Sequence, residues 1–168
     1  MGKVTRGLKA GVLSGLIIGV ILGAVTYATM VLWKEKYLAY FQQIIEHLQE
    51  TYGPLPITAE ALYQYSLNMS FISAILGAVI FGLLFGAVFG WKYEKFPGSP
   101  IVKGLIMGLI VAVVSLVIAY GVPGVRTPFF GGVETFKLAF SIVMYLVWGV
   151  LTSIFYWRWI PKEAAGAG

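Results

Sequence analysis

Few side chains in this 168-residue sequence could support acid–base, nucleophilic or metal chemistry. Cysteine and aspartate are absent, and His47 is the single histidine. Without thiols or a second imidazole, disulfides, cysteine-ligated metal centres and bis-histidine haem are excluded. His47 lies among polar residues on one face of a predicted helix, which is typical of a solvated side chain. We therefore expect no catalytic residue, no metal site and no cofactor, and we predict that the protein is not an enzyme.

Neutral polar side chains are the remaining candidates for binding a ligand. Four of them lie toward the same end of the apolar segments that contain them, namely Tyr27, Asn68, Ser73 and Tyr145. If these residues converge, they form a small polar vestibule for a neutral or weakly polar solute. The simpler interpretation is that each one bonds to its own or a neighbouring helix, an interaction of about 0.6 kcal/mol on average.

The composition excludes a fold that faces water over its whole surface. Hydrophobic residues make up 59% of the chain and charged residues 11%, whereas soluble domains have about 25% charged residues. Because too few polar side chains are present to cover a soluble globule, we expect lipid to surround most of the chain. The net charge of +5 comes from basic residues scattered beside apolar segments, which predicts no nucleic-acid partner. The scarcity of labile residues is typical of a thermophile and equally of membrane chains.

Four long segments contain no Asp, Glu, Lys or Arg, at residues 10–33, 61–91, 104–125 and 138–157. Each meets the length of about 20 residues that a helix needs to cross about 30 Å of hydrocarbon. In lipid, every backbone N–H and C=O group needs a hydrogen-bond partner within the protein, which only helices and closed β-barrels provide. Because these segments lack the alternating apolar and polar residues of barrel strands, we expect helices. We therefore predict an all-α integral membrane protein, a four-transmembrane-helix bundle in a single membrane domain over residues 1–168. The helices are expected at about residues 8–33, 67–91, 101–121 and 137–159.

The basic residues predict how the helices are oriented. One side of the predicted membrane helices holds eight of the twelve, Lys3, Arg6, Lys9, Lys92, Lys95, Lys103, Arg158 and Lys162. The other side holds Lys34, Lys36, Arg126 and Lys137. Since short loops rich in Lys and Arg stay in the cytoplasm, we predict a multi-pass protein of the plasma membrane with both termini cytoplasmic. The first apolar segment is too long for a signal peptide core, so we expect it to be retained.

The segment between the first two membrane helices, residues 34–66, has structure of its own. Its apolar residues recur at helical spacing, at Tyr37, Leu38, Phe41, Ile44, Ile45 and Leu48. This pattern predicts an extracytoplasmic amphipathic helix, which ends near Gly53 and lies flat in the interface or covers the bundle as a lid. Thr58 then has the position of an N-cap for a short helix that leads into the second membrane helix.

Small residues recur every four positions in the first two membrane helices. The first ladder is Gly7, Gly11, Gly15, Gly19 and Gly23, and the second includes Ala78, Gly82, Gly86 and Gly90. Such ladders form shallow grooves in which two helix backbones can approach closely. We predict that these helices pack along the ladders, either against each other or against copies of themselves. A structural seam inside one bundle is the simpler of these interpretations.

The segment that begins at Arg6-Gly7 resembles the one that begins at Lys103-Gly104. The second and fourth membrane helices also end alike, in Trp91-Lys92 and Trp157-Arg158. These similarities are consistent with two related helical hairpins, as in transporters built from parallel repeats. They are also common features of any helices with this orientation, so the duplication stays a hypothesis.

The features together favour a non-catalytic multi-pass membrane protein. We expect an accessory or structural subunit that packs through small-residue grooves, in a homo-oligomer or against other membrane subunits, with the lipid bilayer as its surroundings. The main alternative is a small transporter or channel component for a neutral or weakly polar solute. A weaker alternative is a protein that binds lipid or quinone.

Overall fold

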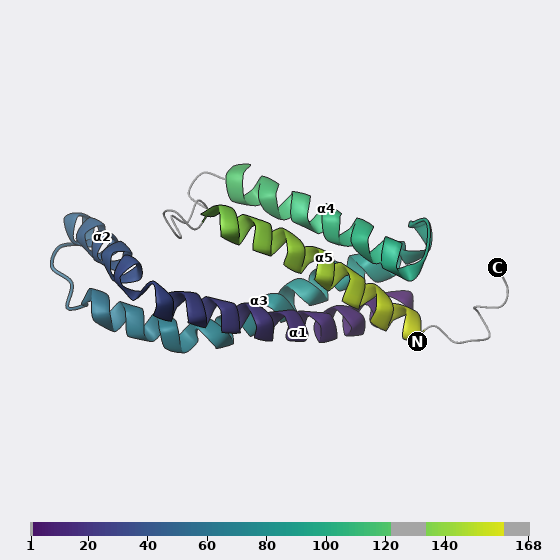
Figure 1. The fold of residues 1–168 in the computed structure, drawn as a ribbon, viewed down its shortest axis with the longest axis horizontal. Helices are drawn as coiled ribbons and strands as arrows, with labels where there is room; N and C mark the ends of the chain where they lie inside the picture. Colours follow the sequence, from purple (N-terminus) through teal and green to yellow (C-terminus); the bar gives the residue numbers. More distant parts are fainter. Residues whose placement is uncertain (1, 122–133, 160–168) are drawn as a thin grey trace. The chain divides into compact units, whose positions relative to one another are not determined.

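The computed structural model describes residues 2–121 and 134–159, and all regular structure in these residues is helical (Figure 1). The elements are α1 (Lys3–Leu32), α2 (Lys34–Tyr52), α3 (Ala59–Lys92), the short 3-10 helix η1 (Tyr93–Lys95), α4 (Pro100–Gly121) and α5 (Glu134–Arg158). Four stretches are helices long and apolar enough to cross a membrane, at Lys3–Leu32, Ala59–Lys95, Pro100–Val117 and Ala139–Arg158. The prediction of an all-helical chain with four such helices is therefore confirmed for the described residues.

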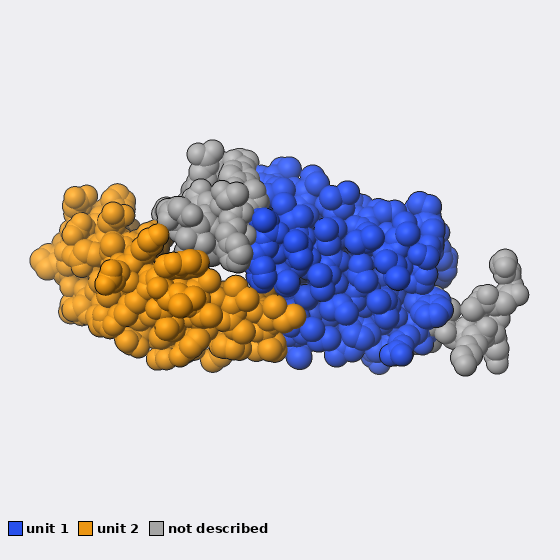
Figure 2. Space-filling model, in the orientation of Figure 1, with its two compact units in different colours: residues 1–18, 76–168 blue, residues 19–75 orange. Residues whose placement is uncertain are grey.

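The chain divides into two compact units (Figure 2). Unit 1 consists of residues 1–18 and 76–168, and unit 2 consists of residues 19–75. Unit 1 therefore contains the first half of α1, the second half of α3, and η1, α4 and α5. Unit 2 contains the remaining halves of α1 and α3 together with α2.

The start and the uninterrupted length of α3 follow from its sequence. The backbone N–H of Ala61 donates a hydrogen bond of 3.2 Å to the Thr58 hydroxyl, so the predicted N-cap is confirmed. The helix that Thr58 caps is one continuous helix of 34 residues, where the sequence predicted a short helix followed by a membrane helix. No proline interrupts this stretch, and its glycines do not break a helix that has an apolar environment on most sides.

The helix α2 begins directly after Trp33, the single residue that separates it from α1. It buries Tyr37, Phe41 and Ile45, which recur every four residues, while the polar residues between them are exposed. It ends at Gly53, whose φ of 84° is favourable for glycine, and this end agrees with the predicted one. Its location outside the cytoplasm, like the orientation of the termini, stays a prediction.

In unit 1, α1 and α3 approach each other backbone to backbone. A Cβ atom added at Gly7 would lie 2.7 Å from the Cα of Gly90, and one added at Gly11 would lie 2.9 Å from the Cα of Gly86. Real Cβ atoms do not come this close to another backbone. Glycine is therefore required at these positions for the observed distance between the two helices.

A second close approach in unit 1 joins α4 and α5. A Cβ atom added at Gly104 would lie 2.7 Å from the Cα of Val150, and one added at Gly108 would lie 2.8 Å from the Cα of Leu146. From the other side, a Cβ atom on Gly149 would lie 3.0 Å from the Cα of Gly108. The predicted ladders did not include these three glycines.

The tight packing of unit 1 predicts opposite effects for two glycines of α3. Gly82 faces Gly11 and Gly15, whereas nothing lies within 4 Å of a Cβ atom added at Gly77. We expect Gly82→Ala to lower the free energy of unfolding by about 1–3 kcal/mol, because the methyl group overpacks the contact. We expect Gly77→Ala to raise it by up to about 1 kcal/mol through helix propensity alone. Unfolding by denaturing detergent, followed by circular dichroism, measures both, and equal effects would contradict the packing described here.

Candidate functional site

The four residues predicted as a possible ligand site are divided between the two units. Tyr27, Asn68 and Ser73 belong to unit 2, and all three are exposed, whereas Tyr145 belongs to unit 1. The Tyr27 ring lies 6.2 Å from the ring of Phe71, centroid to centroid. The Ser73 hydroxyl donates a hydrogen bond of 2.8 Å to the Met69 carbonyl of its own helix.

Tyr145 packs in a group of aromatic side chains in unit 1. Its ring lies 5.6 Å from that of Phe81, which also contacts Trp148 edge to face at 5.2 Å. Trp148 is 1% exposed and fills this part of the core between α3 and α5. No hydrogen bond joins any two of the four predicted residues, all of which lie in the described part of the chain. The contacts of Tyr27, Ser73 and Tyr145 fit the interpretation in which each residue is bound locally.

Polar side chains that the sequence analysis did not select are fully buried in unit 1. The hydroxyls of Ser14 and Thr152 lie 2.5 Å apart and join α1 to α5, and Ser14 also donates to the Ala10 carbonyl at 2.7 Å. Ser153 donates a hydrogen bond of 2.5 Å to the Pro100 carbonyl and joins α5 to α4. The signal in the sequence is Thr152-Ser153, two adjacent hydroxyl residues within an apolar helix.

These hydroxyls satisfy one another and the backbone. All three side chains are 0% exposed, so an unpaired hydroxyl there would carry the full desolvation cost. Gly11 and Gly15 lie close to Ser14 in the sequence, and Gly149 precedes Thr152 by three residues. Small residues of this kind let helices approach closely enough for short side chains to meet. The arrangement holds helices together.

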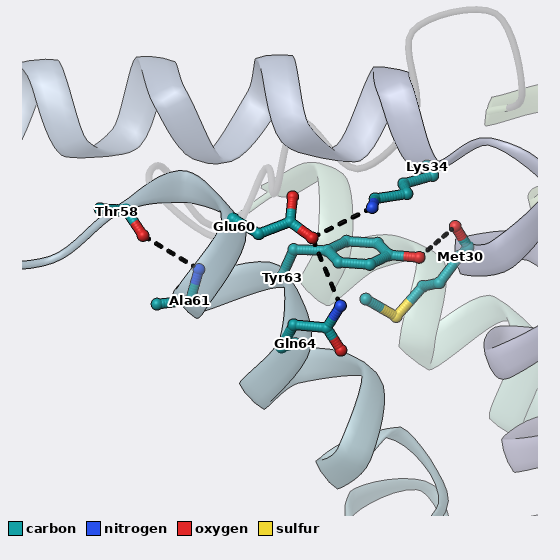
Figure 3. Close-up of polar contacts among 7 residues, drawn as sticks. All are labelled: Met30, Lys34, Thr58, Glu60, Ala61, Tyr63 and Gln64. Atoms are coloured by element: carbon teal, nitrogen blue, oxygen red, sulfur yellow. Dashed lines mark hydrogen bonds and ion pairs between the residues drawn. The ribbon is translucent and has the colours of Figure 1, made fainter.

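In unit 2, polar contacts connect the ends of α1, α2 and α3 (Figure 3). The Lys34 ammonium lies 3.0 Å from a Glu60 carboxylate oxygen, which also accepts a hydrogen bond of 3.3 Å from Gln64. Tyr63, 2% exposed, donates its hydroxyl proton to the Met30 carbonyl at 3.1 Å. That carbonyl is near the C-terminus of α1, where four carbonyls have no partner within the helix.

The buried face of α2 meets the same region. Burial raises the pKa of the Tyr37 phenol above its ordinary value, while a side-chain hydrogen bond with Thr29 acts in the opposite direction. The phenol of Tyr37 therefore stays neutral at physiological pH. His47 lies on the exposed face of α2, 3.8 Å from the Glu50 carboxylate, with a side chain that is 81% exposed.

The described residues contain no cluster of three or more His, Cys, Asp or Glu side chains that could hold a metal ion. The chain matches no known protein family, no curated protein and no solved structure.

The contact between Tyr63 and Met30 predicts a measurable contribution to stability. Tyr63→Phe removes the hydroxyl and leaves the Met30 carbonyl without this donor, so we expect a loss of about 0.5–1.5 kcal/mol in the free energy of unfolding. Tyr65→Phe is the matched control, because Tyr65 is 64% exposed on the same helix. Detergent-denaturation curves compare the two variants, and equal losses would show that the Tyr63 hydroxyl makes no special contact.

The buried pair Ser14 and Thr152 predicts coupling between two helices. In a double-mutant cycle of Ser14→Ala and Thr152→Val, we expect an interaction free energy of about 0.6 kcal/mol, the average for such bonds in membrane proteins. A control cycle combines Thr152→Val with Ser70→Ala, because the Ser70 hydroxyl binds the Leu67 carbonyl of its own helix. That control should be additive, and additivity in both cycles would argue against the hydrogen bond between α1 and α5.

Proposed function

We propose that this chain is a non-catalytic multi-pass membrane protein that serves as an accessory or structural subunit. In a bilayer it packs against helices of a partner protein or of a second copy. One support is that residues 10–32 and 61–91, which form most of α1 and α3, contain no charged side chain. Ionisable groups within membrane helices are typical of pumps and proton-coupled carriers.

The observation that carries the proposal concerns the glycines of α3. Gly82, Gly86 and Gly90 are matched by glycines of α1 inside unit 1, so these ladders are already occupied by the chain itself. Gly77 belongs to the same helix, yet it is exposed and faces open space. A glycine costs a helix about 1 kcal/mol relative to alanine, and in membrane helices close packing commonly offsets this cost. We therefore propose that a helix of another protein, or of a second copy, contacts the exposed face of α3 around Gly77.

The residues beside Gly77 suit such a contact. Leu76, Ile80 and Leu84 are 57%, 57% and 64% exposed, and they recur every four residues along α3. Large apolar side chains that flank a glycine form the walls of a groove for a neighbouring helix. In the absence of a partner, the same face would contact lipid tails.

The alternatives have less support from the contacts. A transporter or channel component would use Tyr27, Asn68, Ser73 or Tyr145 to line a path for a neutral solute. Ring packing occupies Tyr27 and Tyr145, and a backbone carbonyl accepts the Ser73 proton. No specific contact favours transport or the binding of lipid tails or quinone over the subunit role.

A mass measurement in mild detergent tests the proposal. We expect the purified protein to elute as an oligomer of the 18.3 kDa chain or in a fixed ratio with a second membrane protein. Gly77→Leu should reduce this association at least about tenfold, because the added side chain fills the groove. Its free energy of unfolding should not fall below that of the unmodified chain, because leucine favours a helix nearly as much as alanine does. Val113→Leu, a larger side chain at an exposed site of α4, is the control and should leave association unchanged.

Two results would contradict the subunit role. One is a monomer with no companion protein under all mild detergent conditions. The other is rapid swelling of proteoliposomes in glycerol or urea, which would instead favour the transport alternative.

A further inference from the structure

Two similar short segments lie next to each other at one end of unit 1. Trp91-Lys92 ends α3, and Trp157-Arg158 ends α5. Tyr93 directly follows the first segment and Tyr156 directly precedes the second, and the centroids of these two rings are 4.3 Å apart. The contact between the two tyrosines therefore brings the two tryptophan–cation segments together.

The two tyrosines hold this end of the unit in place from the inside. Tyr93 and Tyr156 are 5% and 1% exposed, and the Tyr156 hydroxyl donates a hydrogen bond of 3.4 Å to the Gly90 carbonyl. The Arg6 guanidinium lies over the Tyr156 ring at 5.5 Å, and the Lys103 ammonium lies over the Tyr93 ring at 4.3 Å. Because both rings are buried and packed, the segments beside them have a defined position.

The tryptophans of both segments lie on the outer surface of the unit. Trp91 and Trp157 are 64% and 54% exposed, and Trp159 is 39% exposed, whereas Trp148 in the core is 1% exposed. Tryptophan is enriched at membrane–water interfaces, because its ring is apolar and its N–H group needs a polar partner. The exposed rings therefore fit the boundary between lipid tails and headgroups.

A cation accompanies the exposed rings in each segment. The Lys92 ammonium lies 3.7 Å from the centroid of the Trp91 ring, and Arg158 is exposed between Trp157 and Trp159. Within the described part of the chain, no carboxylate lies within 4.0 Å of Lys92 or Arg158. Both charges are therefore available to a negatively charged group outside the protein.

The charge around the two segments is strongly positive. Among the described residues, Glu94 is the carboxylate at this end of unit 1, and it pairs with Lys3. The cations at the same end are Lys3, Arg6, Lys9, Lys92, Lys95, Lys103 and Arg158. A layer of anionic headgroups complements this charge, whereas a zwitterionic layer has no net charge to offer.

We propose that Trp91-Lys92 and Trp157-Arg158 form an anchoring surface for anionic phospholipid headgroups. The rings lie at the depth of the upper lipid tails, and Lys92 and Arg158 reach the phosphates. Each cation near an anionic membrane surface is expected to favour it about fivefold, the ratio that corresponds to about 1 kcal/mol. This inference rests on the membrane location in the proposed function and does not depend on the subunit role.

Quenching of tryptophan fluorescence by brominated phospholipids tests this surface. The full chain carries Trp33→Phe, which removes the tryptophan that lies between α1 and α2, and is reconstituted into bilayers. Phosphatidylglycerol or phosphatidylcholine, brominated near the headgroup, is added at equal mole fraction. We expect phosphatidylglycerol to compete for the exposed tryptophans about fivefold more strongly. At about 1 M salt, where the Debye length is about 3 Å, this ratio should fall toward one.

Charge variants show which residues produce the preference. Lys92→Gln with Arg158→Gln should bring the ratio close to one and leave quenching by phosphatidylcholine unchanged. The matched control, Lys34→Gln with Lys36→Gln, removes the same net charge from two exposed lysines of α2 and should keep the ratio. Lys92→Arg with Arg158→Lys keeps the charge at both positions and should also keep the ratio.

The outcomes separate this inference from the proposed function. Equal quenching by the two lipids before any charge is changed, or an unchanged ratio in the glutamine variant, would overturn the anionic preference alone. Absence of quenching by either lipid would contradict the membrane location, and with it both proposals.

Discussion

The close approach of α1 and α3 in unit 1 is the constraint on which the rest of that unit depends. Apolar side chains gain nothing by leaving lipid for a neighbouring helix, so packing distance and short-range contacts have to supply the attraction. Glycines at Gly7, Gly11 and Gly82 allow that distance because they have no Cβ atom in the contact. A methyl group at any of these positions would push the two backbones apart. The contact is therefore sensitive to the smallest possible change in side-chain volume.

Glycines of the close approaches lie near the buried hydroxyls in the sequence. Hydroxyls of serine and threonine are short, so they can join two helices only where the backbones are close. Ser14 follows Gly11 by three residues, and Thr152 follows Gly149 by three residues. The bond between these hydroxyls joins α1 to α5, whereas the close glycine approaches of unit 1 join α1 to α3 and α4 to α5. It therefore links the two closely packed helix pairs. Their burial costs little because each hydroxyl has a partner.

Much of the fold could be predicted from the sequence, because the rules involved are local. Charge-free segments of sufficient length gave the four helices, Thr58 gave the start of α3, and Gly53 gave the end of α2. The spacing of glycines likewise showed which residues share one face of a helix. Spacing alone does not tell which helix lies against that face. For this reason, the contacts of Gly104, Gly108 and Gly149 were not predicted, since no ladder of four or five steps marks them.

The contacts of the polar side chains could be predicted even less well from the sequence. Tyr27, Asn68, Ser73 and Tyr145 were grouped because they lie at similar depths, but depth does not determine the direction in which a side chain points. In the sequence, Arg6 and Lys103 were used as markers of orientation and of a possible repeat. Their joint position over two stacked tyrosines depends on where η1 and the end of α5 lie in three dimensions.

The contacts of Arg6 and Lys103 with two tyrosine rings also bear on the hypothesis of two related hairpins. Arg6-Gly7 and Lys103-Gly104 have the same order, and in unit 1 each glycine of these pairs lies against a helix backbone. Arg6 lies over the ring of Tyr156 near the end of α5, and Lys103 lies over the ring of Tyr93, which directly follows α3. Each cation therefore contacts a tyrosine of the other hairpin. Exchange of this kind is what a two-fold relation between hairpins would produce, because each hairpin then offers one cation and one ring. The ion pair of Lys3 and Glu94 belongs to the first hairpin alone, so the relation between the two hairpins is approximate.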